Sequence, residues 1–267
     1  MATIAMNVPD RQVSIGRVLG RAFGTIGGNP ATTIGIAFLF GALPQTLVRL
    51  ILIPLRANAT GQANVLAGLA ITFGSALLAL AFYAIVQGSL VRATVDHDEG
   101  RRAGLGESMM AGLSVVVPLI LMAIISGIAM MFGMVLLVVP GIILYLMWSV
   151  ASSALVDERL GVFGALARSR FLTKGYRWRI LGFVLLLFVV TAIVSSIGSV
   201  LVVAGTSFSV QSITAAQQSQ SVTATIGLLV IGTFISVLSG VCHASLFVEL
   251  RNAKDGPSEQ ALSKVFS

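Results

Sequence analysis

The sequence predicts an all-α integral membrane protein with six transmembrane helices in three hairpins. Of its 267 residues, 56% are hydrophobic and only 10% are charged, whereas a soluble domain carries about 25% charged residues. The mean hydropathy is +0.97, so too little polar surface is present to cover a water-soluble globule. Six apolar stretches are separated by polar segments. Five of them exceed the roughly 20 residues that a bilayer requires, and the fourth, the shortest, is expected to borrow residues from the segment that follows it.

The six stretches pair along the chain into three predicted hairpins. In the first stretch, Pro44 should kink the helix because it lacks a backbone N–H. Pro140 and Gly141 are expected to form the tight turn between the third and fourth stretches, and residues 91–102 are expected to be a charged loop. The predicted spans are residues 31–53, 65–90, 115–138, 142–156, 180–204 and 222–248.

A shorter segment precedes each hairpin, at residues 15–23, 105–113 and 163–171. Each has a large apolar residue, then glycine, then seven residues that end on a large apolar residue. We expect these segments to form amphipathic helices at the cytosolic membrane surface. They suggest three repeat units, 1–90, 91–156 and 157–250, in one membrane domain of residues 1–250, and a cytosolic tail at 251–267. The alternative is that any surface helix shows this pattern.

The charged residues are distributed unequally between the two sides of the predicted topology. If both termini lie inside, 15 of the 17 lysines and arginines and all ten acidic residues fall on the inner side. Only Arg49 and Arg56 lie toward the other side. Because basic residues are retained in the cytoplasm, we expect a multi-pass membrane protein with both termini inside.

The segment between the fourth and fifth spans is the main candidate site. It begins with the acidic pair Asp157 and Glu158, which could form a structural ion pair with Arg168 or Lys174. Cations near a membrane surface attract anionic lipid headgroups at about 1 kcal/mol each, but the same charges could serve topology and structure alone. Both interpretations stay open. We call its five cations the cationic collar: Arg168, Arg170, Lys174, Arg177 and Arg179.

Helical spacing predicts how the collar is arranged. Arg170, Lys174 and Arg177 lie four and three positions apart, so one helix would place them on one face. The opposite side would carry the apolar residues Phe163, Leu166, Ala167 and Phe171. This arrangement would lay the helix in the interface with its cations toward the headgroups.

Two ionisable residues within the spans, Arg49 and His243, are weaker candidates, since such groups often mark functional sites. Each has a simpler explanation: the arginine can reach the interface with its long side chain, and a hydrogen bond can satisfy the histidine. The acidic run at residues 96–99 could ligate a cation, but pairing with Arg101 and Arg102 is the simpler expectation. The small residues of two other segments predict close helix packing: Gly20, Gly24 and Gly28, and Gly232, Ser236, Gly240 and Ala244.

No catalytic residue, cofactor or metal site is expected. The sequence contains no G-x-S-x-G motif, no H-E-x-x-H motif and no phosphate-binding glycine loop. The single cysteine, Cys242, excludes an internal disulfide.

Several short motifs carry a resemblance to a known family. They are Pro140-Gly141, Asp157-Glu158, Gly164-Ala165-Leu166, Arg168-Ser169 and Leu172-Thr173-Lys174-Gly175, together with an opening segment at 14–23 and a closing one at 247–256. The chain resembles the membrane domain of glycerophosphoryl diester phosphodiesterases and related stand-alone bacterial inner-membrane proteins of uncharacterised role. The resemblance implies six helical spans in the bacterial inner (cytoplasmic) membrane. The family's catalytic barrel is a separate domain for which this chain has no room, so no phosphodiesterase activity is implied.

These observations favour a non-enzymatic inner-membrane protein that interacts with anionic phospholipid or supports envelope organisation. The alternative is a small transporter or channel-like protein with a path between the hairpins, and an intramembrane enzyme comes third. The expected partners are membrane phospholipids and either a second copy or another membrane protein. Nucleic acid is not expected, because the net charge of +7 is distributed between apolar spans.

Overall fold

The computed structural model describes residues 13–57, 65–101, 104–204 and 222–256, and within these ranges every regular element is a helix. Six helical segments are long and apolar enough to cross a membrane. The predicted all-α, multi-pass membrane fold is therefore confirmed. In chain order the helices are α1 (Ile15–Gly28), α2 (Pro30–Ile36), the π-helix η1 (Ala37–Ala42), α3 (Leu43–Ala57), α4 (Val65–Asp98), α5 (Leu105–Ser114), α6 (Val116–Leu136), α7 (Val138–Trp148), α8 (Ala151–Glu158), α9 (Val162–Thr173), α10 (Arg177–Ala204) and α12 (Val222–Lys254).

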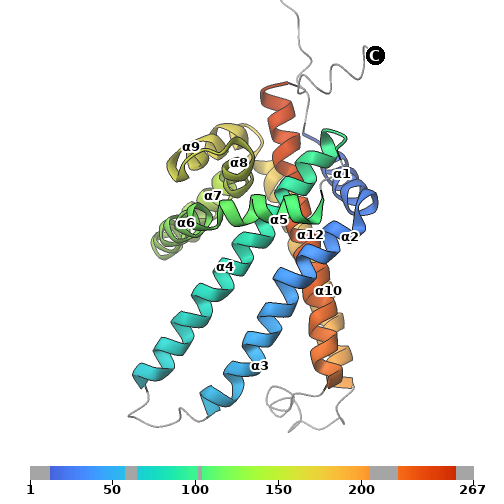
Figure 1. The fold of residues 1–267 in the computed structure, drawn as a ribbon. Coiled ribbons are helices and arrows are strands. Elements are labelled where there is room, and N and C mark those ends of the chain that lie inside the picture. Colours follow the sequence, from blue (N-terminus) through green and yellow to red (C-terminus); the bar gives the residue numbers. More distant parts are fainter. Residues whose placement is uncertain (1–12, 58–64, 102–103, 205–221, 257–267) are drawn as a thin grey trace, which may run out of the picture.

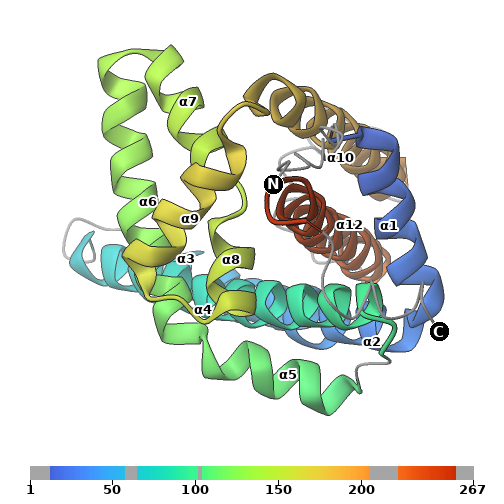
Figure 2. The ribbon, with the colours of Figure 1, turned by 90° about the horizontal axis from the view of Figure 1, so that it is seen from above.

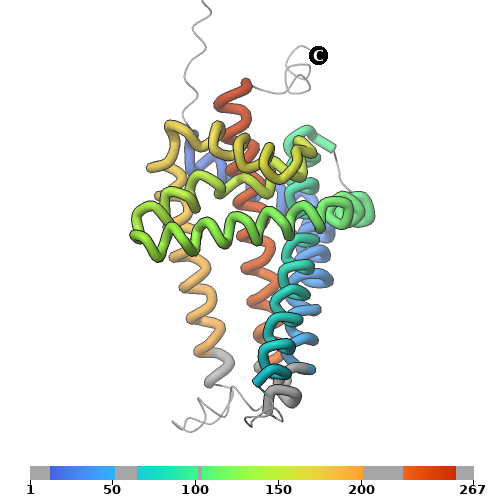
Figure 3. The backbone as a smooth tube through the Cα atoms, turned by 90° about the vertical axis from the view of Figure 1, so that its left-hand side faces the viewer, coloured from blue at the N-terminus to red at the C-terminus, as the bar shows by residue number. Residues whose placement is uncertain are grey.

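The long helices do not all run in one direction. Helices α3, α4, α10 and α12 extend away from the end of the molecule where α1, α5 and α9 lie (Figure 1). The hairpin of α6 and α7 instead lies crosswise to α4, α10 and α12, close to that same end (Figure 3). Viewed from above, α1, α5 and α9 lie around the ends of α4 and α12, and each precedes a pair of apolar segments (Figure 2).

The first span contains the irregularity predicted at Pro44. Proline has no N–H to donate to the carbonyl four residues before it, and the preceding turns widen into the π-helix η1. There the N–H of Leu43 bonds to the carbonyl of Phe38, five residues back. A Cβ at Gly41 would meet the Oγ of Ser236 at 2.9 Å, so the widened turn lies directly against α12.

The turn of the second hairpin differs from the prediction. The break between α6 and α7 is at Leu137, which has extended backbone angles (φ −168°, ψ 140°). The predicted turn at Pro140 and Gly141 is wrong, because both residues lie in the first turn of α7, where the missing N–H of proline is not needed. Gly141 instead permits close packing, since a Cβ there would meet the backbone N of Met134 at 3.0 Å.

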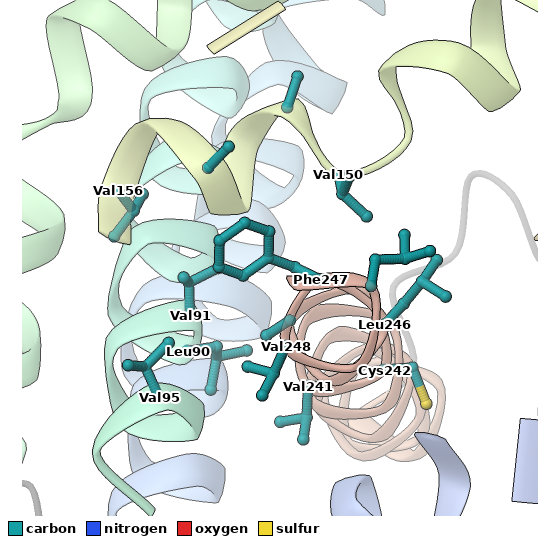
Figure 4. Close-up of a cluster of buried hydrophobic side chains, with 14 of the residues drawn as sticks. Leu90, Val91, Val95, Val150, Val156, Val241, Cys242, Leu246, Phe247 and Val248 are labelled. Carbon is teal, nitrogen blue, oxygen red and sulfur yellow. The ribbon is translucent and has the colours of Figure 1, made fainter. Parts of the chain in front are cut away.

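The predicted charged loop at residues 91–102 is also wrong for most of its length, because α4 continues to Asp98. Its last turns are buried against α8 and α12, and this burial outweighs the polar composition of the segment. The core there is formed by residues of all three helices (Figure 4): Leu90, Val91 and Val95 of α4, Val156 of α8 and the residue Val150 before it, and Val241, Cys242, Leu246, Phe247 and Val248 of α12.

The other end of the molecule is packed much less closely. On α4, Phe73 and Leu77 are largely exposed, as are Phe188 and Ile197 on α10. In a membrane, acyl chains can cover such side chains without a protein partner. The tight core therefore lies at the end that also carries most of the described charged residues.

Small residues support close packing on α12 but not along the whole predicted stripe of α1. A Cβ at Gly240 would meet the Cδ1 of Leu90 at 2.4 Å, and one at Gly232 would meet the Cβ of Ala42 at 3.5 Å. On α1, a Cβ at Gly20 would have nothing within 4 Å, and Gly28 packs against the ring of a single histidine rather than against a helix.

Candidate functional site at the charged end

We use the name charged end for the region where α1, the last turns of α4, α8 and α12, and helix α9 meet (Figure 1). Its ion pairs join elements that are far apart in sequence. The ion pairs determine which charged groups stay available for a ligand.

Glu249 of α12 is buried, with 5% of its surface exposed. The Nε of Arg17 lies 2.7 Å from its Oε1, and the Nη1 of Arg21 lies 3.3 Å from its Oε2. Arg21 also approaches Asp98 of α4, with its Nε 2.8 Å from the carboxylate. One buried carboxylate therefore holds α1 against α12, and Arg21 connects both to α4.

Asp96 is the second buried carboxylate of the charged end. It accepts from the Nε of Arg92 at 3.0 Å and from the Nη2 of Arg101 at 2.6 Å, and Arg101 also pairs with Glu99. The hydrogen bond to Asp96 raises the pKa of the Arg101 guanidinium above its ordinary value. The acidic run is thus engaged by arginines, and no group of three or more potential metal ligands occurs in the part of the chain that the structure describes.

The acidic pair Asp157 and Glu158 contacts two different arginines. The Nε of Arg168 on α9 lies 2.9 Å from each carboxylate oxygen of Glu158, and the same guanidinium pairs with Asp255 beyond α12. Burial lowers the pKa of Arg168, but its hydrogen bonds to Asp255 and Glu158 outweigh that effect, so its pKa is raised. Asp157 pairs with Arg251 of α12, 94 positions away, a partner that the sequence analysis missed.

A break in the fourth apolar segment provides a further contact for α9. Helix α7 ends at Trp148 and α8 begins at Ala151, so carbonyls in the last turn of α7 lack helical N–H partners. The carbonyl of Met147 accepts hydrogen bonds from the Oγ of Ser169 at 2.8 Å and the Oγ1 of Thr173 at 3.3 Å. Side chains of α9 therefore satisfy the backbone at this break.

These contacts determine which face of α9 points outward. Leu166, Ser169 and Leu172 are buried, together with Ala165 and Thr173. The exposed residues follow helical spacing on the other side: Phe163, Ala167, Arg170, Phe171 and, just after the helix, Lys174. We call this exposed set the α9 outer stripe.

The predicted arrangement of the collar is wrong in two respects. Phe163 and Phe171 lie on the same exposed side as Arg170, whereas only Leu166 of the predicted apolar set points inward. Arg177 does not continue the helical face of Arg170 and Lys174, because α9 ends at Thr173 and Arg177 begins α10. The chain changes direction through Gly175, whose φ of +94° is readily adopted only by glycine.

The five collar cations consequently have different environments. Arg168 is engaged by two carboxylates, and the Nη1 of Arg179 donates a 2.9 Å hydrogen bond to the carbonyl of Val13. Arg177 is half-buried, and its Nε has no hydrogen-bond partner within the described ranges. Arg170 and Lys174 are exposed, and neither forms a salt bridge to any described carboxylate.

Two cavities open at the charged end. One, of about 230 Å³, lies between the junction of α1 and α2 and the end of α4, where Asn29, Thr33, His97 and Arg101 line it. Gly28 keeps it open to His97, since a Cβ there would meet the Cε1 of the ring at 2.6 Å. The other, of about 320 Å³, is lined by Arg17, Arg21, Glu249, Asn252 and Ala253.

The two weaker intramembrane candidates line neither of these cavities. The Nδ1 of His243 lies 2.7 Å from the carbonyl oxygen of Ser239, one helical turn earlier, and donates to it. Arg49 is exposed on α3, a helix that extends away from the charged end (Figure 1). The structure thus brings neither residue together with the collar.

The three segments that carry the family resemblance meet at the charged end. Arg17 and Arg21 belong to the opening segment, Glu249 and Arg251 to the closing one, and Asp157 to the central one. No family model, curated protein or solved structure matches the chain. The resemblance therefore stays a prediction.

Proposed function

We propose that this protein is a non-enzymatic protein of the bacterial inner membrane whose α9 outer stripe binds anionic phospholipid headgroups at the cytoplasmic surface. Both termini lie in the cytoplasm in this proposal. The observation that carries it is the pairing of exposed cations with exposed aromatic rings on one side of α9. Arg170, Lys174, Phe163 and Phe171 are all exposed on this surface, and the ring of Phe171 also lies under the cation of Lys254.

The ion pairs around α9 favour an external anion at the stripe. The nearby carboxylates Asp157, Glu158 and Asp255 are already engaged by Arg168 and Arg251. Arg170 and Lys174 are left without a described carboxylate to balance them. Because an unpaired cation at a membrane surface attracts anionic headgroups, the stripe has the charge that such a ligand requires.

The aromatic rings support a membrane ligand over a soluble anion. Phe163 is 74% exposed, and Trp178 at the start of α10 is 86% exposed. Large aromatic side chains are costly to leave in water, and tryptophan is enriched at membrane–water interfaces. A helix that presents rings and cations together can bury the rings among lipid while its cations contact the phosphates.

The test compares lipid binding by two variants of equal charge. In the double variant Arg170→Gln, Lys174→Gln, two cations near the surface are removed at about 1 kcal/mol each, so phosphatidylglycerol should bind roughly 30-fold more weakly in phosphatidylcholine nanodiscs. The control, Arg49→Gln with Arg56→Gln, removes the same charge from α3 and should bind normally.

Membrane insertion is measured in parallel for both variants. If the Arg170 and Lys174 double variant inserts correctly and binds phosphatidylglycerol as tightly as the control, the proposal is wrong. If it misinserts, and lipid binding by the correctly inserted fraction is unchanged, the collar serves topology alone.

A further inference from the structure

We infer that the α6–α7 hairpin does not cross the bilayer but lies within one leaflet, on the side of the charged end, where lipid acyl chains cover its apolar surface. Its direction in the fold is the first observation. The hairpin lies crosswise to α4, α10 and α12, whose apolar lengths define the membrane normal (Figure 3). A hairpin in this orientation runs along the membrane plane.

The chemistry of the hairpin fits acyl chains as its partner. No charged residue or histidine occurs between Glu107 and Asp157. The tip is apolar and exposed on both sides of the turn, with Val135 at 80% exposure, so water is a poor environment for it. Every residue from 131 to 139 except Gly133 is exposed.

Lipid is favoured over a protein partner because this surface resembles the lipid-facing parts of the long helices. Side chains such as Phe73 and Leu77 of α4 show the same combination of large apolar groups and high exposure. The hairpin offers no charged group with which a protein partner could be oriented. Acyl chains need only apolar surface, which it presents along its length.

Both ends of the hairpin are bent, and both bends are held in place. Val115 lies between α5 and α6 with φ −111° and ψ 7°, and Val150 lies between α7 and α8 with φ −113° and ψ 12°. The second bend is held by the hydrogen bonds from Ser169 and Thr173 to Met147. Near the first, Gly112 lies against α4, where a Cβ would meet the carbonyl of Ile85 at 2.7 Å.

The length of α7 also favours the in-plane position. Its 11 residues span about 17 Å before the break, which is short of the roughly 30 Å thickness of the hydrocarbon core. The charge distribution is compatible with this position as well. Both ends of a hairpin lie on the same side whether it crosses the bilayer or not, so the basic residues stay where the topology rule requires them.

The test places single cysteines in a Cys242→Ala background, which removes the one native cysteine. Leu137→Cys marks the hairpin tip, and Leu66→Cys marks the far end of α4. In intact spheroplasts, a membrane-impermeant maleimide should label the cysteine at position 66 and leave the one at position 137 unlabelled. A fluorophore at 137 in nanodiscs should then be quenched more by lipids with the spin label near the headgroup than by lipids labelled near the chain end.

Three results would each overturn the inference. Labelling of position 137 from outside would show that the tip reaches the far side of the membrane. Strongest quenching at the bilayer centre would place the tip too deep for an in-plane hairpin. Absence of quenching at every depth would show that protein, such as a second copy, covers the tip.

Discussion

The Nε of Arg17 on α1 donates a 2.7 Å hydrogen bond to the Oε1 of Glu249 on α12, across 232 positions of the chain. Arg21, one turn later on α1, contacts the other oxygen of the same carboxylate. The first and last described helices are therefore fastened together at the charged end. This contact makes Glu249 the residue whose removal should affect the assembly of the helices most.

We expect Glu249→Gln to lower the free energy of unfolding by about 3 kcal/mol, because removing one partner of a buried ion pair costs about 3–5 kcal/mol and Arg17 keeps part of its contact with water. Thermal unfolding in detergent measures the change. Glu107→Gln is the control, since Glu107 is exposed on α5. Equal unfolding temperatures for the two variants would contradict a structural role for this carboxylate.

The helix break after α7 gives a second prediction. Ser169→Ala combined with Thr173→Val should destabilise the protein by about 1–3 kcal/mol, because the carbonyl of Met147 loses both side-chain donors. Ser199→Ala should have little effect, since Ser199 bonds only within the exposed part of α10. If the double variant unfolds at the same temperature as the Ser199 variant, the hydrogen bonds to Met147 do not stabilise the backbone at the break between α7 and α8.

Two glycines of α5 should respond in opposite ways to alanine. At Gly112 a Cβ would meet the carbonyl oxygen of Ile85 at 2.7 Å and the Oγ of Ser89 at 2.3 Å, whereas at Gly106 it would have nothing within 4 Å. We expect Gly112→Ala to destabilise the protein by about 1–3 kcal/mol through overpacking. Gly106→Ala should be neutral or stabilising by up to about 1 kcal/mol, because alanine favours a helix. Comparable stability of both variants in detergent would show that α4 and α5 can move apart without lowering the free energy of unfolding.

Reporter fusions test the predicted topology. Because basic residues are retained in the cytoplasm, fusions after Arg102 and at the C-terminus should be active in the cytoplasm. Fusions after Asn58 and after Gln218 should be active outside the cytoplasmic membrane. These positions give the same result whether α6 and α7 cross the bilayer or not. A cytoplasmic signal at Gln218 would contradict the arrangement of the last two spans.

Sequence reasoning predicted the helices well, but it misplaced several of their ends. Residues 91–98 were expected in a loop because they are polar, yet they complete α4, since Val91 and Val95 pack into the core between α8 and α12. The turn expected at Pro140 lies instead at Leu137. In both places packing against another helix determines where the helix ends, and the local sequence pattern does not predict that packing.

The candidate site was also predicted only in part. Arg168 and Glu158 are ten positions apart, so their pairing was one of the alternatives that spacing allowed. The pairing of Asp157 with Arg251 was missed, because nothing in the sequence near Asp157 points to a residue 94 positions away. The outward direction of Phe163 and Phe171 was missed for a similar reason, since Ser169 and Thr173 turn the other face of α9 toward Met147.

The sequence by itself determined that this is an all-α membrane protein with six helical segments long and apolar enough to span a bilayer. Length and hydropathy suffice for that conclusion, because a helix in lipid satisfies its own backbone. Only the tertiary structure decided that Glu249 joins α1 to α12 and that α6 and α7 lie crosswise to the other long helices. The physical reason is that an apolar surface is equally compatible with lipid and with protein. Residues such as Leu136 and Val138 therefore do not indicate in which direction the hairpin of α6 and α7 runs. The bends at Val115 and Val150, and the contacts that hold them, determine the direction of the hairpin.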